Sequence, residues 1–343
     1  MIDRRKFLFT PLALACAADR PPNLVLIIAS GWRGQATPWD GDSDLVAPNL
    51  AKLGAQSVVF SRTYCASPKR ELAQTALLTS KFPHAAKLDD KVLGSLKMLT
   101  PDAAATAFSK APFAVRILLT SAGGPAPGPV HLRGNVPSAK VPSERGEVAN
   151  FYGGCKNIDS ALGEILGALD KLNLAQDTVI AFTSDCGQQL GSHGLDGGEV
   201  PFEESVRIPL AIRYPRKLQP EARDLASQVD IMPTLLALCG MEIPEGAQGQ
   251  DLFGKTPSEV VFAEGKFGEA DEWRMLVRGY DKIVATPKGE VIHLFNLAED
   301  PYELTDLARD AAQKLKLASL KAQLQVEMKR LGDGMDPSGL RKR

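Results

Sequence analysis

The amino-acid sequence predicts an α/β protein, with a central, mostly parallel sheet flanked by helices and a small C-terminal antiparallel sheet packed with a helix. Several apolar runs show no alternation, as in strands buried on both faces of a parallel sheet. Segments between them carry apolar residues at helical spacing. The 343 residues are 44% hydrophobic and 24% charged. This composition is typical of a globular protein and excludes a disordered chain or a coiled coil.

The charge balance and the distribution of apolar residues exclude two function classes. The formal net charge is -1, with Lys+Arg 40 against Asp+Glu 41. Without a basic excess, we expect no nucleic-acid partner. The only long apolar run lies at the start of the chain, which excludes a polytopic membrane protein.

The first residues predict an export signal over 1–18. Arg4 and Arg5 precede an apolar stretch over 8–18 that is too short to span a bilayer as a helix. The pattern fits a twin-arginine (Tat-like) or Sec signal, or a lipoprotein signal in which Cys16 carries the lipid anchor. The alternative is an ordinary amphipathic first helix. An export signal predicts a periplasmic protein or one anchored by lipid at the cell envelope.

Four cysteines remain beyond the export signal, namely Cys65, Cys155, Cys186 and Cys239. In an oxidising compartment they allow three disulfide pairings, and the sequence does not choose among them.

The first domain is expected over 21–243. Its predicted strands are the apolar runs 24–28, 114–119, 178–182 and 210–212, and its predicted helices cover 48–56 and 157–171. A Gly/Pro-rich loop, 123–129, follows the second strand. In sheets of this kind ligands lie beyond the carboxyl ends of the strands, so functional residues are expected just after these runs.

A C-terminal α+β subdomain is expected over 258–343, after a linker at 244–257. Short strands are predicted at 259–262, 274–277, 282–285 and 293–295, followed by a charged helix over 305–330.

Seven segments of the chain together resemble the sulfatase family, which belongs to the alkaline phosphatase superfamily. In chain order they are 22–29, 47–50, 64–84, 182–187, 202–209, 229–235 and 294–303. The resemblance implies a sulfatase/alkaline-phosphatase-like fold. It also implies a sulfuric ester hydrolase of sulfated carbohydrates or aryl sulfates. Working members carry a Cys or Ser oxidised to formylglycine in a C/S-x-P/A-x-R motif. Calcium lies beside it, held by three aspartates and an amide or imidazole, while lysines, an arginine and histidines bind the sulfate.

The metal ligands implied by the resemblance are mostly replaced. The paired aspartates after the first strand align with Ser30 and Gly31, and the later ligands align with Asp185 and Cys186. Only Asp185 is retained, so we expect the calcium site to be lost and no cofactor to be bound. A zinc or copper site of Cys186, Asp185 and His193 is the alternative, although its spacing matches no zinc pattern.

The nucleophile and the anion-binding residues of the family are replaced as well. The formylglycine position aligns with Arg70 and the motif arginine with Gln74, while Cys65 lies upstream. A histidine and a lysine of the family align with Gly123 and Gly198, and its Lys and His pair has no counterpart. Loss of metal, nucleophile and positive charge together predicts a pseudoenzyme, silent by the family mechanism.

The remaining charges suggest a binding role, with Arg70, Lys69 and His193 as candidate binding residues. An arginine binds sulfate or carboxylate readily, so the cleft could hold a sulfated glycan or another small anion. Alternatively, Arg70 pairs with Asp185 or Glu71 and closes the pocket.

Two further alternatives remain open. One is an active sulfate- or phosphate-ester hydrolase that uses a displaced group such as Cys65, Ser67 or Thr75. The other is a decaying gene with no selected function.

Overall fold

The computed structural model describes residues 21–86, 97–99, 114–119, 123–125, 128–138, 141–255 and 258–333. The predicted export signal at 1–18, with Cys16, lies outside these residues. No helix within them is long and apolar enough to cross a membrane.

The larger of two sheets has seven strands in the order β3-β4-β1-β5-β6-β2-β7. Its strands are β1 (Asn23–Ala29), β2 (Val58–Tyr64), β3 (Lys97–Leu99), β4 (Ala114–Leu119), β5 (Thr178–Thr183), β6 (Arg207–Arg213) and β7 (Glu221–Ser227). The pairs β3/β4, β4/β1, β1/β5 and β2/β7 are parallel, whereas β6 is antiparallel to β5 and β2. The mostly parallel sheet is confirmed. The run 210–212, expected among the parallel strands, lies in antiparallel β6, because an apolar run carries no information on strand direction.

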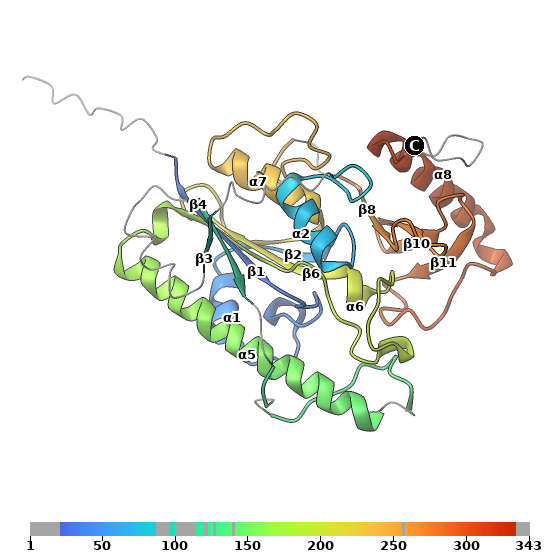
Figure 1. Cartoon of the computed structure of the whole chain (residues 1–343), viewed down its shortest axis with the longest axis horizontal. Helices are drawn as coiled ribbons and strands as arrows, with labels where there is room; N and C mark the ends of the chain where they lie inside the picture. Colours follow the sequence, from blue (N-terminus) through green and yellow to red (C-terminus); the bar gives the residue numbers. More distant parts are fainter. Residues whose placement is uncertain are drawn as a thin grey trace, which may run out of the picture.

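Helices cover both faces of this sheet (Figure 1). They are α1 (Pro48–Gly54), α2 (Arg70–Thr79), α5 (Val141–Lys171), α6 (Glu203–Val206) and α7 (Ile231–Leu238). Alternate residues of β1 face opposite layers. Val25 and Ile27 pack in a cluster with residues of α1 and α5, whereas Leu24 and Leu26 pack in a second cluster with residues of α2 and α7. Burial on both sides explains the uninterrupted apolar sequence of this strand.

A second, antiparallel sheet has the strand order β11-β10-β9-β8. Its strands are β8 (Val260–Gly265), β9 (Trp273–Arg278), β10 (Asp281–Ala285) and β11 (Val291–Asn296), and α8 (Lys314–Leu331) packs on it (Figure 1). The opposite face of this sheet shares a core with the first sheet, where Met275 and Val284 meet Tyr64 and Val206. The predicted small sheet with a helix is confirmed. The division into domains at 21–243 and 258–343 stays a prediction.

Several boundaries differ from the predicted ones. Helix α5 begins at Val141 rather than at 157, and α8 begins at Lys314 rather than at 305. The segment 305–313 instead contains turns and the short 3-10 helix Ala311–Gln313. Strands β2 and β7 were not predicted, because polar residues interrupt both and neither has the continuous apolar run that identifies a buried strand.

Candidate functional site

The candidate site lies where β1 and β5 end. These strands are parallel neighbours, with Ile28 paired to Thr183, so the residues that follow them lie at one edge of the sheet. Ser30 and Gly31 follow β1, and Asp185 follows β5. The first turn of α2, which begins at Arg70 after β2, points into the same region.

The carboxylate of Asp185 is the centre of this site and is fully buried. Its Oδ2 accepts hydrogen bonds from Ser30 Oγ at 2.7 Å and Gln74 Nε2 at 3.0 Å. Its Oδ1 accepts from the backbone N–H of Gly31 at 2.9 Å and of Cys186 at 2.8 Å. Both oxygens are therefore saturated by donors from three segments. The structure brings together all four predicted metal-ligand positions and the predicted motif-arginine position.

Arg70 adds a positive charge to this cluster. Its Nε lies 3.5 Å from Asp185 Oδ2, while its side chain remains 53% exposed. Of the two carboxylates named as partners from the sequence, the structure pairs it with Asp185. The preceding Lys69 extends outward, and its Nζ lies 3.1 Å from Glu199 Oε1. That hydrogen bond raises the pKa of Lys69 above its ordinary value.

The residues at this position do not fit a calcium ion. Calcium takes six to eight oxygen ligands, usually including several carboxylates. Here a single carboxylate faces hydroxyl, amide and backbone donors, and a guanidinium stands where a cation would need an acceptor. A soft-metal site would need the third proposed ligand, His193, whose contacts lie in a different cluster. Burial, and then the nearby charge of Asp185, raise the pKa of Cys186 to about 12.

The thiol of Cys65 is fully buried, with its Sγ 3.8 Å from the carbonyl of Ser205. Burial raises its pKa well above the ordinary value, so it is not a thiolate nucleophile at neutral pH. The hydroxyl-bearing alternatives are enclosed as well, with Ser67 1% and Thr75 4% exposed. Cys65, Cys155, Cys186 and Cys239 are all free and buried, so none of the possible disulfides is formed.

His193 lies in a different polar cluster. Its ring stacks on Phe202 at 3.9 Å between centroids, and its Nε2 lies 3.0 Å from Asn135 Nδ2 and 3.9 Å from Glu204 Oε2. Burial lowers its pKa. None of these contacts is shared with Asp185, and the structure does not gather Cys186, Asp185 and His193 into one ligand set.

Two other groups of potential metal ligands occur among the described residues, and both already contain cations. His193, Glu204 and Glu303 form one group. Arg133 Nε lies 2.6 Å from Glu204, and Lys282 Nζ lies 2.7 Å from Glu303. These cations neutralise the carboxylates that a metal would need.

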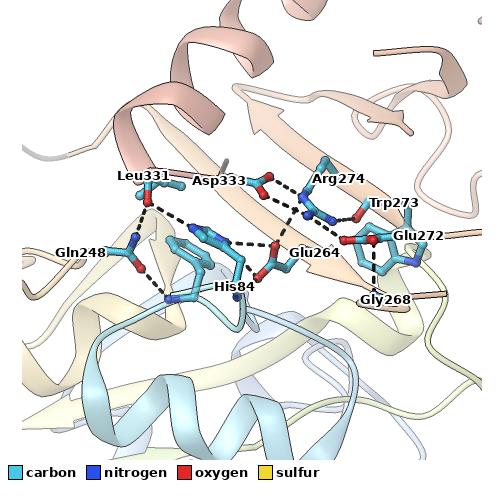
Figure 2. A network of polar contacts seen from close by, with 10 residues as sticks. His84, Gln248, Glu264, Gly268, Glu272, Trp273, Arg274, Leu331 and Asp333 are labelled. Carbon is cyan, nitrogen blue, oxygen red and sulfur yellow. Dashed lines mark hydrogen bonds and ion pairs between the residues drawn. The ribbon is translucent and has the colours of Figure 1, made fainter. Parts of the chain in front are cut away.

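The second group forms an ion network on the α8 side of the second sheet, drawn in Figure 2. His84 Nδ1 lies 3.1 Å from Glu264 Oε1, and His84 Nε2 lies 3.1 Å from the carbonyl of Leu331. Arg274, 1% exposed, pairs with Glu264, Glu272 and Asp333. Although burial opposes it, the hydrogen bond to Glu264 raises the pKa of His84. The network ties the turn after α2 to β8, β9 and the end of α8, and we assign it a structural role.

A cavity of about 330 Å³ adjoins the Asp185 cluster through Ser30 and Gly31. Its far wall comes from α5, with Glu147, Asn150 and Phe151. The sequence analysis missed these residues, because the predicted helix began at 157 and this half of α5 carries no recognisable motif.

Comparisons with known proteins show a partial similarity to sulfatases. A family model described as Sulfatase matches residues 100–241. The endo-4-O-sulfatase of Bacteroides thetaiotaomicron is 32% identical over 206 residues, which cover 51% of this chain and 40% of that protein. The N-acetylglucosamine-6-O-sulfatase of the same organism is 32% identical over 162 residues, 45% of this chain and 28% of that protein. Over these residues the chain is similar to sulfatases.

Solved structures show a similar fold. One, determined in complex with its substrate D-glucosamine-2-N,6-O-disulfate, has a TM-score of 0.79 at 15% identity over 92% of this chain and 99% of its own. The phosphonate monoester hydrolase of Agrobacterium radiobacter has a TM-score of 0.77 at 17% identity over 90% of this chain and 96% of its own. The matched region spans about 40% or less of the length of the two curated relatives named above.

Proposed function

We propose that this chain is an exported sulfatase-fold protein that binds a sulfated carbohydrate, or another small anion, without hydrolysing it. The observation that carries the proposal is the saturated carboxylate of Asp185, whose two oxygens accept four hydrogen bonds of 3.0 Å or shorter. A carboxylate that is fully used by protein donors offers nothing to a metal ion.

The groups around Asp185 support the proposed absence of family catalysis. Attack on a sulfate ester needs a nucleophile and concentrated positive charge at the developing anion. Arg70 stands at the nucleophile position and is not nucleophilic, because its guanidinium stays protonated. The neighbouring thiols of Cys65 and Cys186 are protonated at neutral pH, since burial raises the pKa of both.

The binding role is supported by the exposure of Arg70. The guanidinium Nε lies 3.5 Å from Asp185 Oδ2, and the side chain is 53% exposed. Its terminal N–H groups have the fork geometry that suits sulfate. Relatives named for action on sulfated sugars support a sulfated carbohydrate as the ligand class. Export to the periplasm or the cell envelope, by a Tat-like or lipoprotein signal with Cys16, belongs to the same proposal.

The test measures calcium dependence, ester turnover and binding on the purified chain. We expect no change in melting temperature between calcium and EDTA, no sulfate release from aryl or sugar sulfates, and a higher melting temperature with a sulfated glycan. Calcium stabilisation that EDTA reverses, together with sulfate release, would overturn the proposal.

The matched variants are Arg70→Gln and Arg216→Gln. Both arginines pair with an aspartate, and their side chains are 53% and 55% exposed. Arg216 pairs with Asp177, which precedes β5, and so lies away from the site. We expect Arg70→Gln to abolish the glycan-dependent shift and Arg216→Gln to preserve it. If Arg70→Gln lowers only the ligand-free melting temperature, the arginine is a structural partner of Asp185 and not an anion-binding residue.

A further inference from the structure

The cavity beside the Asp185 cluster carries an inference of its own. It has a volume of about 330 Å³, within the range of small-molecule sites. Ser30 and Gly31 form one wall, Gln188 another, and the residues of α5 a third. Cys155, Ile158 and Leu190 give it an apolar floor.

Three polar side chains line this cavity without a partner in the described part of the chain. These are the carboxylate of Glu147 and the amides of Asn150 and Gln188. Gln188 lies close to the β1 turn, because a Cβ at Gly31 would meet its Nε2 at 2.2 Å. Gly31 also has a φ of +75°, which favours glycine. The backbone at this position therefore leaves room for the Gln188 amide.

An aromatic ring completes the lining. Phe151 is half-buried at the cavity and lies against the buried guanidinium of Arg33, whose central carbon is 5.1 Å from the ring centroid. Arg33 also donates to Tyr152 at 3.3 Å. These contacts fix the ring in place, so that it offers a preorganised apolar surface to a ligand.

The charge of the lining separates this cavity from the anion position at Arg70. Glu147 is its only ionisable carboxylate, and no lysine or arginine is among the described residues that line it. A carboxylate and two amides suit a ligand with several hydroxyl groups, whereas a sulfated or carboxylated ligand would meet the negative charge of Glu147.

We propose that this cavity binds an uncharged sugar ring. Phe151 packs against the ring, and Gln188, Asn150 and Glu147 make hydrogen bonds to its hydroxyl groups. The inference rests on the proposed function in taking a carbohydrate as the ligand class. It adds that an unsulfated unit lies against α5, while any sulfate group lies outside the cavity on the Arg70 side of Ser30.

The test uses two probes that differ only at C6, methyl β-D-glucopyranoside and its uronate counterpart. Binding of single sugars is weak, so it is followed by ligand-observed NMR titration of the full chain. We expect the neutral glycoside to bind, and the uronate to bind about tenfold more weakly or not at all because of Glu147. Glu147→Gln should bring the affinity of the uronate close to that of the neutral glycoside.

The variants Phe151→Ala and Gln188→Ala test the lining. Each should weaken binding of the neutral glycoside about 3- to 10-fold, the loss expected for one ring contact or one hydrogen bond. Gln325→Ala, on the exposed face of α8, is the control and should change nothing. Gln188→Ala removes only an amide from a half-buried position, so it decides the question if Phe151→Ala fails to fold.

Three results would overturn the inference: no binding of the neutral glycoside, equal binding of the uronate, or unchanged binding in both lining variants. Titration with inorganic sulfate distinguishes failure of sugar binding in the cavity from failure of the anion binding that the proposed function requires. If Arg70→Gln loses sulfate binding and Gln188→Ala binds sulfate normally, the anion position at Arg70 is supported, regardless of the result of the sugar titration. Sugar binding without sulfate binding supports the cavity alone.

Discussion

The substitution Asp185→Asn tests whether this carboxylate is a hydrogen-bond acceptor or a metal ligand. In a metal site, the carboxylate without its ion is an uncompensated buried charge, so neutralising it in EDTA is expected to leave stability unchanged or to raise it. Here the carboxylate already has partners, and the same substitution in EDTA should destabilise the chain. The sign of the change therefore distinguishes the two roles.

The magnitude follows from the four hydrogen bonds to the carboxylate. Oδ1 accepts from two backbone N–H groups, of Gly31 and Cys186, which have no alternative geometry. Oδ2 accepts from Ser30 and Gln74, which can reorient to accept from an amide. The asparagine oxygen therefore keeps the hydrogen bonds from the backbone donors, and the stability that is lost is the part that the negative charge added to the hydrogen bonds. Replacing charge-assisted by neutral hydrogen bonds costs about 0.5–1 kcal/mol each, so the expected loss is about 2–4 kcal/mol.

The assay is urea unfolding followed by circular dichroism, in EDTA and in calcium. The control is Asp271→Asn, at an exposed aspartate paired with Lys266, which should leave the unfolding free energy nearly unchanged. An Asp185→Asn variant that is as stable as the parent in EDTA, or a parent that calcium stabilises, would refute the reasoning.

Three further predictions follow from the buried groups. The pKa of His84 is raised in the folded chain, so its contribution to stability is fully present below the ordinary histidine pKa of about 6.5 and is lost as the pH rises through the folded value. The difference in unfolding free energy between the parent and His84→Gln should therefore shrink from pH 6 to pH 9. A constant difference would contradict this prediction. Arg274→Met leaves the carboxylates of Glu264 and Asp333 without their cation and should cost about 3–5 kcal/mol by urea unfolding, with a loss below about 1 kcal/mol arguing against the network. Cys186, with its pKa raised to about 12, should not react with a thiol reagent at pH 8 until urea is added. Mass spectrometry identifies the labelled residue. Labelling of Cys186 in the native chain would show an exposed thiolate and contradict the prediction.

The sequence predicted the layers of the fold because burial leaves a direct trace in it. Strand β1 is apolar at nearly every position, since its alternate residues pack on opposite helical layers. Strand β7, Glu221–Ser227, could not be found in this way, because it is an edge strand with charged residues outside. The direction of β6 depends on its pairing with β5 and β2, which no local pattern encodes.

The positions of the Asp185 cluster were predictable, but their contacts were not. The resemblance placed Ser30, Gly31 and Gln74 at functional positions, and the structure places all three on one carboxylate. It gave no sign of the cavity beside them, because Phe151 and Gln188 acquire their role only when α5 packs beside the β1 turn. Residues that act through packing leave no spacing pattern in the sequence.

The replacements around Asp185 depend on one another physically. An isolated carboxylate that is fully buried is too costly to persist unpaired. In the family implied by the resemblance, a divalent ion compensates several acidic ligands at this position. Where the resemblance implies acids after β1, this chain has Ser30 and Gly31, which donate, and Gln74 and Arg70 supply the remaining donor and the positive charge. Restoring one acid alone, as in Ser30→Asp, would place a second carboxylate against Asp185 without an ion to bridge them. A metal site at this position would therefore need several residues of the cluster to change together.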